Sequence, residues 1–157
     1  MRVARYHNIF GPEGAWNDGR EKSPAALCRK VAMAEDGGEI EVWGDGEQTR
    51  SFLYIDECVE GSLRLMRSDW TGPVNIGSDE MVTINGLAQK IMGIAKKKLS
   101  IKHIPGPLGV RGRNSDNTLV EKMLKWRPRE ALVKGLERTY PWILARVQAA
   151  KQRQPAA

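Results

Sequence analysis

Hydrophobic and polar positions follow two different periods along the chain. Polar and apolar residues alternate over 39–43, which is the period of a half-buried strand, whereas apolar residues return every three or four positions in several longer segments, as in amphipathic helices. Strands are predicted over 3–6, 39–43, 49–55, 74–76 and 99–104, and helices after Ser23, Asp56, Thr83 and Asp116 and along 132–147. Because helices and strands alternate, the pattern predicts the α/β class.

Polar residues that precede the apolar segments predict where the helices begin. Ser23, followed by Pro24, is expected to be the N-cap of the first helix, and Asp56 and Asp116 are expected to cap later helices. Two apolar stripes are expected to face the core. They are Val59, Leu63 and Met66, broadened by Leu65, in the second helix and Leu132, Leu136, Tyr140, Ile143 and Val147 in the last.

Composition narrows the class of protein. The 157 residues, 41% of them hydrophobic and 28% charged, are enough for one ordinary domain. No apolar run approaches the roughly 18 residues that span a bilayer, and no apolar segment follows the charged N-terminus as in a secretory signal. The two cysteines fit neither a disulfide framework nor a metal site. We therefore expect a cytoplasmic protein with no metal and no membrane partner.

The chain is basic, with 25 Lys and Arg against 19 Asp and Glu and a formal net charge of +6. Such a balance favours an anionic partner, either a nucleic acid or a phosphorylated small molecule. Much of the excess lies late in the chain, beginning with the run 96–98, and its simplest interpretation is a solvated helix face. The five tryptophans are not interleaved with basic residues, so a nucleic-acid platform is poorly supported.

Three basic residues are the main candidates for chemistry. Lys22 ends a glycine-containing loop and could act as a general acid or base, or be an ordinary solvated lysine. Arg50 in a strand and Arg111 in a Gly/Pro-rich loop could converge on a diphosphate. The alternatives are an edge-strand salt bridge for Arg50 and a solvent-exposed charge for Arg111.

Several catalytic motifs are missing from the sequence. It contains no Gly-x-Gly-x-x-Gly and no P-loop, and none of its three tyrosines begins a Tyr-x-x-x-Lys motif. The first strand has nothing before it, which leads us to expect that an N-terminal part is missing. His7 and His103 lack companions at metal-ligand spacing, and Cys28 and Cys58 are expected to be packing residues.

Short motifs spread over nearly the whole chain resemble, in order, those of extended short-chain dehydrogenase/reductases that act on nucleotide sugars. They are RYHNIFGP at 5–12, WGDGEQTRSF at 43–52, YID at 54–56, NIG at 75–77, WRP at 126–128 and GL at 135–136. Three longer stretches look like the GDP-mannose 3',5'-epimerase family within that superfamily. These are GREKSPAA followed by CRK at 19–30, PGP at 105–107 and VRGRNSDN at 110–117.

The resemblance implies the C-terminal half of an NAD-dependent enzyme, with the last strands of a Rossmann sheet and a smaller α/β substrate-binding domain. By that likeness, 1–10 and 56–78 belong to the Rossmann sheet, 11–55 and 79–150 are mainly substrate-binding, and 151–157 form a frayed tail. The family converts GDP-mannose to GDP-L-galactose for ascorbate synthesis. NAD oxidises C4, protons exchange at C3 and C5, and the ketone is reduced again.

Site residues follow from the same resemblance. Lys22 matches the family's acid/base lysine. The catalytic tyrosine and its lysine, the acid/base cysteine and the NAD loop lie upstream in that family, so the chain is expected to be inactive alone and to need its missing N-terminal half, with a homodimer as the full-length state. The positions that match substrate-binding residues are Asn8, Glu21, Lys30, Gln48, Arg50 and Arg111.

Two alternatives remain open on the sequence alone. One is another nucleotide-sugar epimerase or dehydratase, which would differ in nucleotide preference. The other is a non-catalytic module that binds a nucleotide sugar or, through its basic surface, a nucleic acid, in which case binding would fall steeply with salt.

Overall fold

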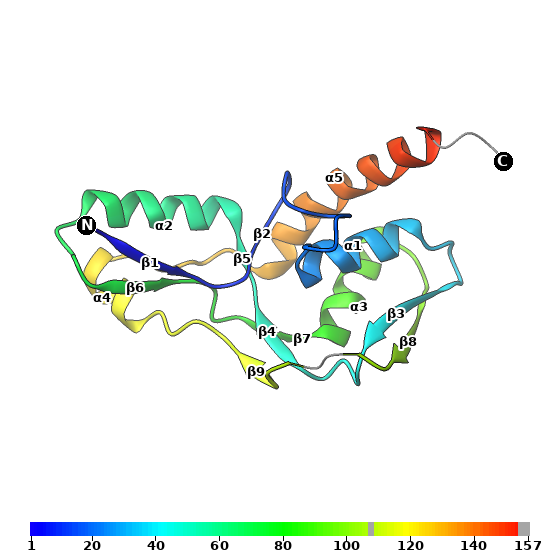
Figure 1. Cartoon of the computed structure of the whole chain (residues 1–157), viewed down its shortest axis with the longest axis horizontal. Coiled ribbons are helices and arrows are strands. Elements are labelled where there is room, and N and C mark those ends of the chain that lie inside the picture. The colour runs from blue at the N-terminus through cyan, green and yellow to red at the C-terminus, as the bar shows by residue number, and fades with distance from the viewer. Residues whose placement is uncertain (107–108, 154–157) are drawn as a thin grey trace.

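The computed structural model describes residues 1–106 and 109–153. Its helices are α1 (Ser23–Met33), α2 (Ile55–Arg67), α3 (Ile84–Ala95), α4 (Thr118–Leu124) and α5 (Leu132–Arg153). Its strands are β1 (Val3–Tyr6), β2 (Ile9–Phe10), β3 (Glu39–Trp43), β4 (Thr49–Ser51), β5 (Leu53–Tyr54), β6 (Pro73–Ile76), β7 (Met81–Thr83), β8 (Ser100–Ile104) and β9 (Gly112–Arg113). The predicted α/β class is confirmed (Figure 1).

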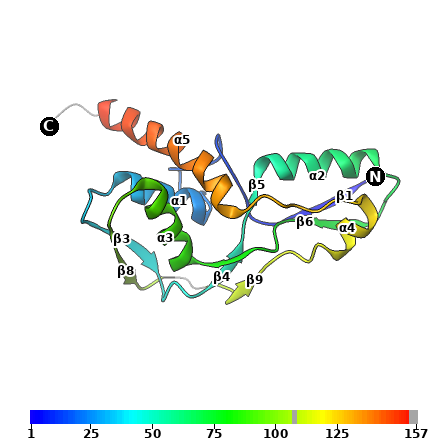
Figure 2. The same cartoon turned by 180° about the vertical axis from the view of Figure 1, so that it is seen from behind.

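Short and mostly parallel pairings join strands that are far apart in sequence. β1 pairs with β6, β2 with β5 and β3 with β8, all in parallel. β4 is the central strand of three, antiparallel to β7 and parallel to β9. Figure 1 shows β1, β6, α2 and α4 at one end of the molecule and α1, α3, β3 and β8 at the other. The view from behind shows the same division, with α4 beside β6 (Figure 2).

Two buried apolar clusters correspond to these two ends. We call the smaller one the small core; it contains Leu53, Cys58, Leu65, Val74, Ile76, Val120 and Leu124. The large core is built around the buried faces of α1, α3 and α5. α4 contributes Val120 and Leu124 to the small core, so it packs with β6 although it lies within 79–150. The division into a Rossmann part and a substrate-binding part stays a prediction.

The sequence prediction is most accurate for four of the strands and for the apolar stripe of the last helix. Strands form at 3–6, 39–43, 73–76 and 100–104, as predicted within one residue. The apolar residues expected to line the last helix are all buried, at 5% exposure or less. α5 runs through Arg153, three residues into the segment expected to fray, and 154–157 lie outside the described residues. The predicted strand over 49–55 is split, because the Asn8 carbonyl accepts from the Leu53 N–H and draws the chain from β4 to a new partner, β2.

Three predicted N-caps are wrong, two of them by one residue and that of α2, where Tyr54 is the cap, by two. Ser23 is already the first helical residue of α1, and Lys22, with an extended backbone, occupies the cap position without a side-chain bond. α2 begins at Ile55, which leaves Asp56 inside its first turn. Asn117 is the cap of α4, while Asp116 accepts a 2.9 Å hydrogen bond from the Thr118 N–H.

The predicted buried stripe of α2 is right at Leu65, which is buried, and wrong at Val59 and Met66, which are 49% and 69% exposed. Cys58 and Gly61 are buried in their place. The reason is the close approach of the WRP segment: a Cβ on Gly61 would stand 2.6 Å from the Trp126 ring. The small residue lets α2 press its other face inward, and a stripe of Cys, Gly and Leu is weak on a hydrophobicity pattern.

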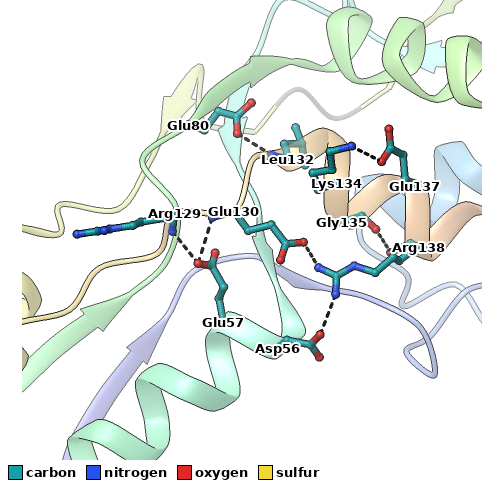
Figure 3. Close-up of polar contacts among 11 residues, drawn as sticks. Asp56, Glu57, Glu80, Arg129, Glu130, Leu132, Lys134, Gly135, Glu137 and Arg138 are labelled. Carbon is teal, nitrogen blue, oxygen red and sulfur yellow. Dashed lines mark hydrogen bonds and ion pairs between the residues drawn. The ribbon is translucent and has the colours of Figure 1, made fainter.

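Carboxylates from the small-core end hold the start of α5. Glu57 accepts hydrogen bonds from two successive backbone N–H groups before the helix, at 2.6 and 3.1 Å, and Glu80 accepts from the N–H of its first residue at 2.7 Å. Arg138 donates to both Asp56 and Glu130 (Figure 3). α5 packs along α1 in the large core, so these contacts tie the two ends of the molecule together.

Candidate functional site

A pocket of about 630 Å³ opens between α1, the end of β3 and the start of β4. Its size is within the range of small-molecule sites. The apolar part of its wall is formed by Ala26, Leu27, Val42, Trp43 and Ile84, together with Gly19 and Gly109. The polar part is formed by Glu21, Ser23, Arg29, Lys30, Glu41, Gln48 and Arg50.

Helical periodicity places one face of α1 on this pocket. Ser23, Ala26, Leu27 and Lys30 recur at the i, i+3, i+4, i+7 spacing and all line it. The opposite face of α1 packs in the large core, where Cys28, Val31 and Ala32 are fully or almost fully buried. The packing of α1 therefore fixes where Lys30 stands.

Glu21 and Arg29 form an ion pair in the pocket wall. The Arg29 Nη2 lies 2.7 Å from the Glu21 Oε1, and the two side chains are 23% and 9% exposed. A hydrogen bond from its own backbone N–H, with others from Arg29 and the Gly19 N–H, outweighs partial burial and lowers the pKa of Glu21. The carboxylate is thus ionised at neutral pH, and Arg29 serves to orient it.

Lys30 and Gln48 are both held by backbone carbonyls. The Lys30 ammonium donates to the Glu41 carbonyl at 2.6 Å, and the Gln48 amide donates to the Trp43 carbonyl at 3.3 Å. The Gln48 Oε1 is buried and has no hydrogen-bond partner among the described residues. A buried acceptor without a donor is costly, so this oxygen is suited to receive an N–H or O–H from a ligand.

Arg50 places a guanidinium on the pocket wall. It projects from β4, the central strand of its sheet, and donates to the Thr49 carbonyl at 2.7 Å. It forms no ion pair within residues 1–106 and 109–153, so the edge-strand salt bridge considered above is not what holds it. A Cβ on Gly109, which has φ +62°, would stand 3.6 Å from its Nη2.

Three of the predicted site residues do not line the pocket. Asn8, with φ +44°, donates to the Ser51 carbonyl at 3.0 Å, where β1 gives way to β2. Lys22 is exposed and lies between two lining residues of the sequence. The Arg111 guanidinium is 68% exposed and lies 2.7 Å from the Asp45 carboxylate, as the surface alternative for this residue predicted. The pocket thus brings together Glu21, Lys30, Gln48 and Arg50.

Sequence reasoning missed Arg29 and Trp43. Arg29 precedes a predicted site residue on the same helix, but its contact with Glu21 bridges the loop-to-helix junction and has no periodic signal. Trp43 is the last residue of β3, and the alternation of that strand predicts which side of the strand the tryptophan faces. Its position in the pocket could not be predicted, because that depends on α1, which is distant in sequence.

Comparison with known proteins assigns the class. A model of the NAD dependent epimerase/dehydratase family matches residues 1–77. UDP-glucose 4-epimerase of Thermotoga maritima, solved with UDP-glucose, has 27% identity and a TM-score of 0.83, over 92% of this chain and 46% of that one. Together with the sequence relatives below, these matches show that the chain belongs to the NAD-dependent epimerase/dehydratase family.

Among its sequence relatives is GDP-mannose 3,5-epimerase of Arabidopsis thaliana, which is 56% identical over 150 residues. The match covers 96% of this chain and 39% of that protein. UDP-glucuronic acid decarboxylase 6 of the same plant is 36% identical, over 87% of this chain and 38% of that protein. The chain therefore spans about two fifths of the length of these curated relatives. Within its described residues, no helix is both long and apolar enough to cross a membrane.

Proposed function

We propose that this chain supplies the substrate pocket of a nucleotide-sugar epimerase whose substrate is GDP-mannose or a related GDP-sugar. The observation that carries the proposal is the pocket that gathers Arg50, Lys30 and Gln48 beside an apolar wall. It is supported by the 56% identity to a GDP-mannose 3,5-epimerase, against 36% to a UDP-glucuronic acid decarboxylase.

The proposed roles follow the chemistry of the side chains. Arg50 and Lys30 would bind the diphosphate, since a guanidinium can pair with two phosphate oxygens and an ammonium adds charge. Gln48, with its unpartnered buried oxygen, would accept a hydrogen bond from the nucleotide. Arg111 would join the diphosphate from the loop before β9, and Glu21 would contact the sugar.

Lys22 is proposed as the residue that moves a proton at a sugar carbon. It directly follows Glu21, at the entrance to α1, so it lies next to the pocket in the chain while remaining exposed. Its exposure allows the ammonium to exchange protons with water between turnovers. Asn8 would contact the substrate where the chain crosses from β1 to β2.

NAD is the cofactor that the family's name implies, and the described residues do not fit it on their own. A dinucleotide site needs a glycine-rich turn that leads from a strand into a helix N-terminus. Here β5 and β7 lead directly into α2 and α3 without a glycine, and the glycines between β2 and α1 (Gly11, Gly14 and Gly19) are spread over a 12-residue loop and do not form a G-x-G-x-x-G turn. We therefore infer that an NAD-binding N-terminal segment must join this chain for activity and that the chain is inactive alone. A cytoplasmic homodimer is the full-length state we propose.

The basic surface gives little support to the nucleic-acid alternative. Of the late arginines, Arg127 pairs with Asp79 and Glu121, and Arg138 pairs with Asp56 and Glu130. Their charges are thus partly neutralised in place.

The proposal is tested by equilibrium dialysis of the chain with radiolabelled GDP-mannose. We expect saturable binding that Arg50→Gln weakens about tenfold or more, because a charge-assisted hydrogen bond to phosphate is lost. Arg64→Gln is the matched control, since Arg64 pairs with Glu60 on the distant helix α2. Binding that is abolished by salt alone, or that both variants reduce equally, would contradict the proposal.

A further inference from the structure

The guanidinium of Arg111 is held by an acid outside the pocket. Its Nη1 donates to the Asp45 Oδ2 at 2.7 Å across 66 positions of sequence. The pair is a single hydrogen bond between side chains that are 68% and 50% exposed, so its strength is low.

The backbone of Arg111 nevertheless lies beside the pocket. Its carbonyl accepts a 2.9 Å hydrogen bond from the Thr49 N–H, at the point where β4 begins. The flanking residues of Thr49 along the chain, Gln48 and Arg50, both line the pocket, and so does Gly109, two residues before Arg111. The ion pair with Asp45 therefore determines how often the Arg111 guanidinium is available to the pocket.

Asp45 cannot follow the guanidinium, because its turn is fixed. Its backbone carbonyl accepts from the Asn85 amide at 2.9 Å, and its Oδ1 accepts from the Glu47 N–H at 2.9 Å. The next residue, Gly46, has φ +71°, and a Cβ there would clash with the Asn85 side chain. Hydrogen bonding to Arg111 lowers the pKa of Asp45, so the carboxylate is ionised at neutral pH.

We propose that Asp45 is a positioning residue that competes with the diphosphate of a bound nucleotide for Arg111. The inference rests on the proposed function. A diphosphate carries more charge than one carboxylate and accepts a guanidinium in a two-point geometry, so it takes Arg111 from Asp45. Breaking the pair reduces the affinity for every ligand that recruits Arg111, and a ligand without phosphate leaves the pair intact.

Calorimetric titration of the full chain with GDP and with guanosine tests this role. We expect Asp45→Asn to tighten GDP binding by about two- to five-fold, the worth of an exposed ion pair. Arg111→Gln weakens GDP binding, and the double variant matches Arg111→Gln alone, because Asp45 acts only through that arginine. Guanosine affinity stays constant in all of them. Glu47→Gln is the matched control, because it removes from the same turn a charge that forms no hydrogen bond with Arg111 and keeps the oxygen that accepts from Asn85. Glu47 attracts Arg111 less than Asp45 does, so this variant should tighten GDP binding less than Asp45→Asn.

The outcomes separate the two claims. A gain of affinity is not what structural damage produces, so tighter GDP binding by Asp45→Asn than by Glu47→Gln supports the competition, and equal gains in the two variants overturn the specific role of Asp45. If Arg111→Gln weakens GDP binding while Asp45→Asn weakens it or has no effect, the role of Asp45 is overturned and the proposed pocket stands. If the chain does not bind GDP, or Arg111→Gln changes nothing, the failure lies in the proposed function and the inference falls with it.

Discussion

Lys97 has a structural role that its sequence context hides. It lies in the run Lys96-Lys97-Lys98, for which the sequence predicts a solvated face. Its ammonium instead donates to three backbone carbonyls at the C-terminal end of α1, those of Val31, Ala32 and Ala34, at 2.8, 3.2 and 2.6 Å. These carbonyls lie where a helix leaves acceptors unpaired and where its dipole favours a cation.

Lys97→Met removes the charge and keeps the apolar stem. A hydrogen bond from a charged group contributes about 1.5–3 kcal/mol. Because three bonds share one partly solvated ammonium, we expect a total loss of about 2–3 kcal/mol rather than their sum. For a chain of this size each kcal/mol moves the melting temperature by about 2–4 °C, so the variant should melt about 4–12 °C lower.

Circular dichroism at 222 nm during a thermal scan measures the effect. Lys98→Met is the control, because that side chain is exposed and its only described contact with Asp36 uses the backbone N–H. It should shift the melting temperature by no more than about 2 °C. Equal shifts in the two variants would refute the view that Lys97 holds the end of α1.

Three further predictions concern the junction and the buried residues. Arg138→Gln should lower the melting temperature by about 2–4 °C, because it removes the ion pair that ties α5 to Asp56 of α2 and a second pair with Glu130 just before α5, and an unchanged scan would contradict that role. Gly61→Ala should lower the free energy of urea unfolding by about 1–3 kcal/mol, because the added methyl clashes with the Trp126 ring. Gly93→Ala, with open space around it, should leave that free energy unchanged or raise it. A loss of stability in both variants would count against the packing described. Burial raises the pKa of Cys28 to about 12. The Cys28 thiol should therefore resist iodoacetamide at pH 8 in the native chain and react once urea unfolds the chain, as read by mass spectrometry. Fast labelling of Cys28 in the native chain would show that the large core opens.

Local patterns predicted those parts of the fold that local physics decides. The alternation in β3 and the apolar stripe of α5 give the right element and the right buried face, because one face of each packs on the large core. Beyond Leu65, the buried face of α2 could not be predicted, since it depends on Trp126, 65 positions after Gly61, whose ring packs against that glycine.

In the candidate site, too, local patterns predict the positions of some residues, and only tertiary contacts explain those of others. Helix geometry places Lys30 on the same face of α1 as Ser23, Ala26 and Leu27, whereas Glu21 lies before the helix and is held there by Arg29, a contact without a periodic signal. Gln48 and Arg50 lie two residues apart near one strand, and the pocket places them opposite α1. The contact of Arg111 with Asp45 has no local signal, because it is made between two loops that only the pairing of β4 with β9 brings together.

The most direct test of the central claim is an amide NMR titration of the ¹⁵N-labelled chain with GDP-mannose, and with UDP-glucose in parallel. The account predicts dispersed resonances, with saturable shifts on GDP-mannose that are largest at Glu21, Lys30, Gln48 and Arg50 and much smaller on UDP-glucose. A spectrum that ignores GDP-mannose, responds equally to both sugars, or shifts only at residues away from the pocket would contradict the assignment of this pocket to a GDP-sugar.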